Sequence, residues 1–232
     1  MVRRCVDFVR EQAQDGISMR DPPIDPPSSI GKRKLIYIPI IHTAADMGTL
    51  GASIRGKKLS TLGRQGLTHN AAVVEKMWEE IERVVARLPP TQGTVRLYQD
   101  GLPVCGHERA IVSELAGAGS RNHRLLLELE ARGATLMGTE SPDLLVEEYQ
   151  LATAAFAPGA AVRTNILQQK LRDSLLEKRD RFVADRINKT LSAGESGILF
   201  LGLLHEAAKY LDPDIDVVYP LGLPRTGQRR AG

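Results

Sequence analysis

GILFL, at residues 197–201, is a short apolar run of the kind that forms a β-strand covered on both faces. LIYIPII, at residues 35–41, has the same character. Three further short runs are expected to be strands, at residues 94–98, 134–137 and 216–219. Helical patterns mark the stretches between these runs, at residues 68–88, 106–132, 141–156 and 163–193. This alternation predicts an α/β fold with a largely parallel central sheet of about five strands flanked by helices.

Pro39 interrupts the run at residues 35–41, and its ring nitrogen cannot donate a hydrogen bond to a neighbouring strand. Proline within a sheet is confined to edge strands, strand starts and bulges. We therefore expect this strand to lie at an edge of the sheet or to carry a bulge.

The chain is expected to contain one folded domain between two irregular ends. Its 232 residues and 25.4 kDa suit a single domain, or a domain with an appendage. The proline-rich stretch at residues 21–29 (DPPIDPPSS) excludes helix and central strand. We expect residues 1–33 to form an N-terminal arm with a Pro-rich linker, residues 34–224 a single α/β domain, and residues 225–232 a disordered tail.

The composition is that of a globular protein, with 42 % hydrophobic and 25 % charged residues. Two cysteines, Cys5 and Cys105, are too few for a disulfide framework or a cysteine zinc site. No apolar run approaches the ~18 residues of a membrane span, and Asp7, Arg10 and Glu11 interrupt the apolar core that a signal peptide needs. These features predict a cytoplasmic protein without a membrane partner.

Nucleic-acid binding and several enzyme classes are disfavoured as well. The net charge is only +3, and one Trp, five Tyr and four Phe leave little aromatic surface for base stacking. The chain has no Walker phosphate loop, no dinucleotide-binding fingerprint and no Gly-x-Ser-x-Gly elbow. We therefore expect no nucleic-acid partner. The missing motifs also argue against a kinase, a nicotinamide enzyme and a serine hydrolase.

Polar residues follow four of the predicted strands, at the points where the strands end. His42 follows the first strand, Asp100 the second, Glu140 the third, and His205 and Glu206 the fourth. The carboxyl ends of parallel strands share one edge of the sheet, where α/β proteins bind their ligands. Two imidazoles and several carboxylates in one cleft suit a divalent metal, or a histidine general base held by a carboxylate. The alternative is that each residue is simply polar where the chain leaves the sheet.

Arg179 falls within an apolar stripe of the helical stretch at residues 163–193, and Asp180 lies at the margin of this stripe. A guanidinium on an inward face needs a partner, because an unpaired buried charge is costly. One interpretation is a structural Arg179–Asp180 pair, or an arginine whose head reaches solvent. The other has Arg179 reaching the cleft, where it would hold a carboxylate or an oxyanion.

Three further residues are candidates for the cleft. His107 and Glu108 follow a glycine-containing loop after the second strand, and their alternative is the start of a solvated helix. Asp46 belongs to a run of small residues after the first strand, which has the composition of a ligand-binding loop or lid. His123 is expected to be solvated on a surface helix.

The C-terminal part of the chain resembles a known family. Residues 177–187 read EKRDRFVADRI, and residues 202–205 read GLLH. This is similar to the end of the TraB/Tiki proteins, where a helix with an Arg-Asp or Arg-Asn pair precedes a strand and a Gly-x-x-His motif. That group looks related to the erythromycin esterases and the haem-binding ChaN proteins. The resemblance implies an α/β domain of this superfamily with paired histidines and a glutamate at its cleft, and metal-dependent peptidase activity in the Tiki branch.

The resemblance places Arg179 on the helix arginine, His205 on the second histidine motif and His42 on the first. Two positions depart from the family pattern. Pro39 stands where the first motif usually has glycine, and Asp100 follows the second strand, where a glutamate is expected.

These observations lead to an expected function and two alternatives. We expect a hydrolase, either a peptidase or an esterase, that cleaves an ester or amide bond in a small-molecule or peptide substrate, with or without a divalent metal. Its catalytic residues would be His42, His205, Glu140 and Arg179, and its metal ligands His42, His205 and Glu140. The first alternative is a non-catalytic protein that binds a small ligand or regulates through the same cleft. The second is a structural subunit whose N-terminal arm docks on a partner chain, and homo-oligomers are compatible with all three.

Overall fold

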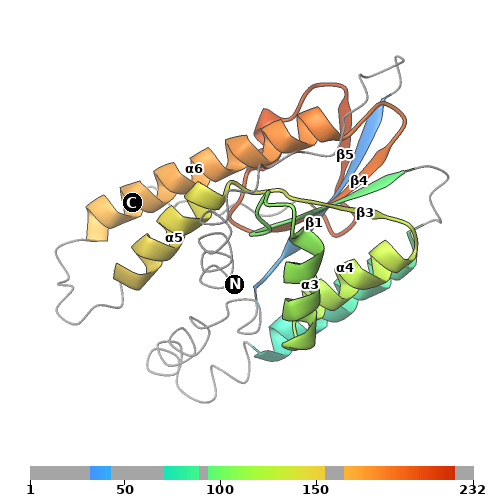
Figure 1. Cartoon of the computed structure of the whole chain (residues 1–232), viewed down its shortest axis with the longest axis horizontal. Coiled ribbons are helices and arrows are strands. Elements are labelled where there is room, and N and C mark those ends of the chain that lie inside the picture. The colour runs from blue at the N-terminus through green and yellow to red at the C-terminus, as the bar shows by residue number, and fades with distance from the viewer. Residues whose placement is uncertain (1–31, 43–70, 89–93, 155–164, 223–232) are drawn as a thin grey trace.

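The computed structural model describes residues 32–42, 71–88, 94–154 and 165–222. Five strands in these residues form one parallel sheet, in the order β3-β2-β4-β1-β5 (Figure 1). They are β1 Arg33–Ile40, β2 Val95–Gln99, β3 Thr135–Met137, β4 Ser196–Gly202 and β5 Ile215–Val218. The predicted α/β fold with a parallel central sheet is confirmed, and each predicted run supplies one strand.

The helical stretch predicted at residues 106–132 is divided between two helices. They are α3 Glu108–Gly117 and α4 Arg121–Ala131. Gly119 adopts a left-handed backbone (φ +95°), which glycine reaches without steric cost, and this ends the first helix. Ser120 then starts the second helix by accepting a hydrogen bond from the N–H of His123. His123 itself is fully buried beside Ser120, so its expected exposure to solvent is wrong.

The remaining helices include one whose start was predicted from its capping residues. The helix at residues 71–86 lies within the predicted stretch 68–88. The other elements are α5 Pro142–Ala154, α6 Asn165–Thr190 and the short 3-10 helix η2 Ala207–Tyr210. At the start of α5, the Ser141 hydroxyl accepts the N–H of Leu144 and Asp143 lies in the first turn, as expected.

The sheet lies between two layers of helices, and each layer encloses a hydrophobic core (Figure 1). In β4, Ile198 and Phe200 face the layer of α3, α4 and the helix at residues 71–86. Leu199 and Leu201 of the same strand face α6 and η2. Because successive strand residues point to opposite faces, two covered faces require the nearly continuous apolar run seen in the sequence.

Pro39 does not place β1 at an edge, so the expectation of an edge position is wrong. β1 lies between β4 and β5 in the sheet. The pairing with β5 covers only Arg33 to Ile36, however, and Pro39 pairs only with Leu201 of β4 in the described sheet. The proline therefore occupies a half of β1 that needs hydrogen-bond donors on one side only.

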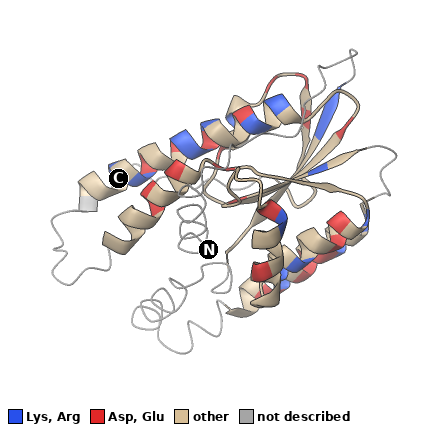
Figure 2. Ribbon diagram, viewed as in Figure 1, with Lys and Arg blue, Asp and Glu red and all other residues tan. Residues whose placement is uncertain are grey.

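Charged side chains are concentrated on the helices, and the strands carry few of them (Figure 2). The main exception lies at the amino end of the sheet, where Arg33 donates hydrogen bonds to Asp212 and Asp214. None of the described helices combines the length and the apolar composition needed to cross a bilayer.

Candidate functional site

A pocket of about 530 Å³ opens at the carboxyl edge of the sheet, next to α5 and α6. Among the described residues, its charged and imidazole side chains come from five separate segments: His42, Asp100, Glu148, Arg179 and His205. The segments after β1, β2 and β4 therefore meet at one place, as their parallel order requires.

Asp100 is the centre of the polar cluster. It directly follows β2, and its backbone N–H continues the sheet by donating to the carbonyl oxygen of Phe200. Its Oδ2 accepts the backbone N–H of Gly202 and lies 2.9 Å from Nε2 of His42. Its Oδ1 accepts a hydrogen bond of 2.8 Å from Arg179. The segment after β1, the end of β4 and helix α6 thus hold this carboxylate in place.

Arg179 joins three carboxylates from three segments. Its Nε and Nη2 donate to both oxygens of Glu140, at 3.1 and 2.6 Å, and Nη2 also donates to Asp100. Its Nη1 donates to Glu148 of α5 at 2.6 Å. Of the two interpretations of Arg179, the structure supports the one that reaches the cleft. Its partners are carboxylates that follow β2 and β3 or belong to α5. No hydrogen bond between Arg179 and Asp180 is present among the described residues.

Asp180 holds His205. The Asp180 Oδ1 lies 2.7 Å from Nδ1 of His205, and its Oδ2 accepts the backbone N–H of Glu206. A carboxylate only accepts hydrogen bonds, so the Nδ1 of His205 carries the proton. The other ring nitrogen, Nε2, then faces Asp100 Oδ2 at 3.5 Å. In the neutral imidazole this nitrogen presents a lone pair to a carboxylate, and a proton or another cation between the two groups removes the repulsion.

Burial and neighbouring charges shift the ionisation of this cluster. Burial alone would raise the pKa of Asp100, but the charges of His205, His42 and Arg179 hold it well below its ordinary value. Burial alone would lower the pKa of His205, but the Asp100 charge and the Asp180 hydrogen bond raise it above its ordinary value. Burial would likewise lower the pKa of Arg179, and its carboxylate partners raise it well above that of a free guanidinium. Asp100 and Arg179 are therefore ionised at neutral pH.

The pKa of Glu148 is raised above its ordinary value, in contrast to that of Asp100. Loss of hydration in the pocket raises its pKa, Arg179 opposes this shift, and the charges of Asp100 and Glu140 add to it. Its side chain remains 41 % exposed, in contrast to Glu140, which is fully buried beneath Arg179. Glu148 is thus the carboxylate of this cluster that solvent and ligands reach most easily.

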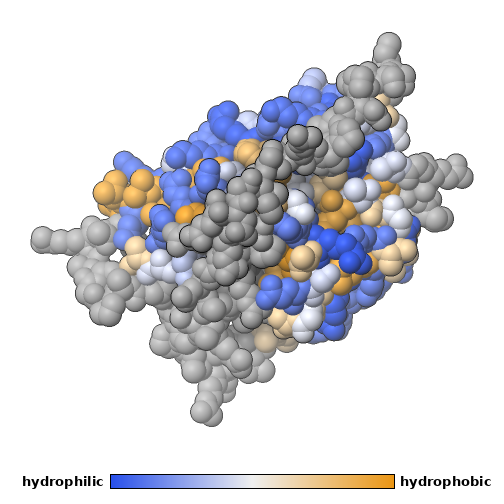
Figure 3. Space-filling model, viewed as in Figure 1, coloured by the Kyte–Doolittle hydropathy of each residue, from blue (hydrophilic) through white to orange (hydrophobic). Residues whose placement is uncertain are grey.

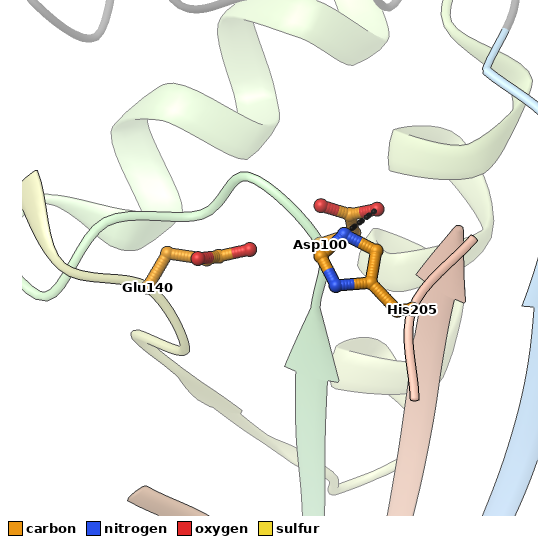
Figure 4. A group of neighbouring side chains, drawn as sticks. All are labelled: Asp100, Glu140 and His205. Atoms are coloured by element: carbon orange, nitrogen blue, oxygen red, sulfur yellow. Dashed lines mark ion pairs between the residues drawn. The ribbon is translucent and has the colours of Figure 1, made fainter. Parts of the chain in front are cut away.

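Three buried residues have donor atoms close enough to hold one metal ion. One atom each of Asp100, Glu140 and His205 lies within 4.8 Å of the other two. Figure 4 shows the Glu140 carboxylate directed toward the other two side chains, which follow β2 and β4. His42, which we expected as a ligand, instead contacts Asp100, and Asp100 takes its place in the group.

No family model, curated protein or solved structure matches the chain. The geometry of the pocket therefore carries the argument about function.

Glu108, His107 and Glu206 are absent from the described lining of the pocket. Glu108 accepts hydrogen bonds from the backbone N–H groups of Cys105 and Gly106 and so closes the loop before α3. His107 precedes that helix and is absent from the described pocket lining. The carboxylate of Glu206 pairs with Lys209, away from His205. Asp46 lies outside the described residues, as do residues 1–31 of the expected arm and the expected tail.

Two residues of the cluster were not among the sequence candidates. Asp180 was seen only as a possible partner of Arg179, although its position one turn before Ala184 places it on the buried face of α6. Glu148 was missed altogether. It lies three residues after the buried Leu145 on α5, and this spacing is the signal that would have placed it on the inward face.

Proposed function

We propose that this pocket hydrolyses an ester or amide bond, with His205 as the residue that accepts a proton from water. The observation that carries the proposal is the arrangement of His205 between two carboxylates. Asp180 binds Nδ1 at 2.7 Å, and Nε2 lies in the pocket wall, 3.5 Å from Asp100. A histidine oriented by a carboxylate on one nitrogen, with the other nitrogen at a pocket, is the usual arrangement of a general base.

The surrounding residues support this role. Asp180 fixes the tautomer and the ring orientation of His205, and the backbone N–H of Glu206 holds Asp180. Asp100 stays ionised, so it would accept a hydrogen bond from a water bound beside Nε2 of His205. Arg179 keeps Asp100 in position and offsets part of the negative charge of the cluster.

A divalent metal fits the same residues. The cluster contains four carboxylates, from Asp100, Glu140, Glu148 and Asp180, against the single guanidinium of Arg179. This excess of negative charge favours a cation, and oxygen and imidazole ligands suit zinc. In a metal-bound form we propose Asp100, Glu140 and His205 as the ligands, with His42 hydrogen-bonded to Asp100 from outside. His205 would then hold the metal instead of acting as the base. A bound metal would lower the pKa of its water toward ~7.

The likeness to the TraB/Tiki proteins enters here as a proposal. Arg179 and His205, which carry the resemblance, come from α6 and from the segment after β4 and line one pocket. His42, on the expected first motif, lines it as well. A shared pocket is what such a relationship requires, and it supports a hydrolase of this superfamily.

A second candidate function is non-catalytic binding of a small ligand. It is favoured by the hydrogen bonds of Arg179, which donates four of them to protein carboxylates. A guanidinium has five N–H groups, so only one remains to stabilise an oxyanion. In a binding protein such a saturated arginine serves to shape the pocket.

The test combines metal content with hydrolysis. Purified protein is loaded with Zn²⁺, Mn²⁺ or Mg²⁺, dialysed and analysed for metal, and then assayed against p-nitrophenyl esters and anilides. We expect one of these substrates to be turned over, and His205→Gln to lose at least 100-fold in kcat/KM. His107→Gln is the matched control, since His107 lies outside the described pocket lining. Equal activity in His205→Gln and His107→Gln would overturn the proposal.

Metal analysis separates the two forms of the chemistry. If the reaction requires a metal, His205→Gln and Asp100→Asn should each bind less metal than the wild-type protein. The activity of metal-free wild-type protein should return when metal is loaded. Turnover that survives chelation identifies His205 as a base that works without metal. Ligand binding without turnover of any ester or anilide identifies the non-catalytic candidate instead.

A further inference from the structure

We infer that the pocket selects a neutral substrate with an aliphatic group next to the scissile carbonyl, such as a medium-chain acyl ester or amide. The inference rests on the proposed hydrolase function and names its substrate class. It is carried by the division of the pocket lining into a charged floor and apolar walls.

Apolar side chains from several segments line the pocket. Ile40 and Ile41 come from the end of β1, Leu176 from α6, and Leu203 and Leu204 from the segment after β4. Tyr149 and Ala152 of α5 also belong to the lining. A volume of about 530 Å³ falls in the range of small-molecule sites, whose walls are mainly apolar with a few polar groups for orientation.

The two leucines after β4 connect the apolar wall to the reacting groups. Leu203 and Leu204 lie between Gly202, whose N–H binds Asp100, and His205. Both side chains are exposed, Leu204 to 79 %. Both leucines line the same pocket as the proposed base, so we infer that the aliphatic part bound against them adjoins the bond that is cleaved.

The charges of the floor argue for a neutral substrate. The Arg179 guanidinium is already bound to Asp100, Glu140 and Glu148, so only one of its N–H groups remains for a carboxylate or phosphate on the substrate. An added anion would also meet an excess of carboxylates. An aliphatic chain meets no such penalty and gains from the removal of leucine surface from water.

Apolar surface also occurs where α6 begins (Figure 3). His205 contacts this helix much further along, at Asp180. Ile166, Leu167 and Leu171 are exposed at the start of α6, with Leu167 at 65 %. These residues are absent from the described pocket lining. They offer a matched control, because a polar substitution there changes exposed apolar surface without changing the pocket.

The experiment measures kcat/KM for the p-nitrophenyl esters of acetate, butyrate and octanoate. Full burial of a methylene corresponds to about fourfold in affinity, and we expect at least a tenfold rise from acetate to octanoate. Leu204→Ser should reduce the octanoate-to-acetate ratio at least threefold, whereas Leu167→Ser should leave it unchanged. A flat profile with active enzyme, or the same loss in both variants, overturns the inference and leaves the hydrolase standing.

A binding measurement keeps the two proposals separate. The probes are octanamide and acetamide, titrated by calorimetry into the folded His205→Gln protein with and without Leu204→Ser. We expect octanamide to bind at least tenfold more tightly than acetamide, and Leu204→Ser to remove most of the difference. This result without turnover of any ester rejects the hydrolase and retains the aliphatic ligand. Equal binding of both probes rejects the aliphatic ligand.

Discussion

His205 and Asp180 are joined through Nδ1 and Oδ1 at 2.7 Å, although 25 residues separate them in the chain. Asp180 belongs to α6, and His205 follows β4, so the contact fixes the end of a central strand against the helix that covers it. The same contact determines which nitrogen of His205 faces Asp100. The packing of α6 and the orientation of the proposed base are therefore one structural feature.

We expect Asp180→Asn to impair the site while the fold is retained. The amide nitrogen of asparagine donates hydrogen bonds, so the substituted residue serves either His205 Nδ1 or the Glu206 N–H well, but not both. Loss of such a supporting carboxylate typically reduces metal affinity or activity about 10- to 100-fold. Asp185→Asn is the control, because Asp185 pairs with Lys189 on the exposed side of the same helix. Circular dichroism and kcat/KM decide the case, and equal effects of both changes would contradict the role given to Asp180.

Arg179→Met should be strongly destabilising. It leaves the buried carboxylates of Asp100 and Glu140 without their cationic partner, and breaking a buried pair in this way costs about 3–5 kcal/mol. The control is Arg181→Met, two residues further along α6. It removes an exposed arginine that pairs with Glu177, and the free energy of unfolding should change far less. Urea unfolding measures both free energies. Similar values for the two variants would show that the Arg179 network is not important for stability.

Two glycines of β4 separate an effect on the site from an effect on the core. A Cβ at Gly202 would lie 2.8 Å from Asp100 Oδ2, so Gly202→Ala should displace that carboxylate and reduce activity or metal binding at least tenfold. A Cβ at Gly197 would lie 2.6 Å from Cδ1 of the buried Leu35, and overpacking there should cost about 1–3 kcal/mol. Folded Gly197→Ala should keep its activity per molecule. The test measures the activity of both variants per folded molecule. An inactive Gly197→Ala with an active Gly202→Ala would reverse the assignment.

The stability of the metal-free protein should fall as the pH rises above neutral. The pKa of His205 is raised above its ordinary value of 6.5, so the folded state holds this proton more tightly than the unfolded state does. Its contribution to the free energy of unfolding is complete below pH 6.5 and is lost as the pH rises through the raised pKa. Urea unfolding in chelator between pH 6 and 9 should show this decline. His205→Gln should lack it and His107→Gln should keep it, and an unchanged slope in His205→Gln would contradict the assignment.

Much of the architecture was predictable because it depends on short-range patterns. The apolar runs at residues 35–41 and 197–201 require two covered faces, and these runs became the two strands at the middle of the sheet. Ser141 and Pro142 likewise predict the start of α5 from groups only a few residues apart. The parallel order of the strands was enough to bring His42, Asp100 and His205 to one edge.

Other features were not predictable from such patterns. The break at Gly119 and Ser120 has a local signal, a left-handed glycine followed by a capping serine, which apolar periodicity alone does not reveal. The acceptability of Pro39 depends on where β5 ends, which is decided by pairing across the sheet. The outcome at Pro39 therefore depends on neighbours that the local pattern does not contain.

The sequence alone determined the five strand runs and the helical stretches between them, because these follow from periodicity within a few residues. Their alternation along the chain then indicated the parallel sheet and the edge at which the polar residues gather. Tertiary structure alone decided the pairing of charges. Arg179 could bond to its neighbour Asp180, yet it binds Asp100, 79 residues away, and leaves Asp180 to His205. That choice depends on strand order and on the rotation of α6 about its axis, which are set by packing over the whole sheet. The role of each charged side chain therefore becomes visible only in the folded protein.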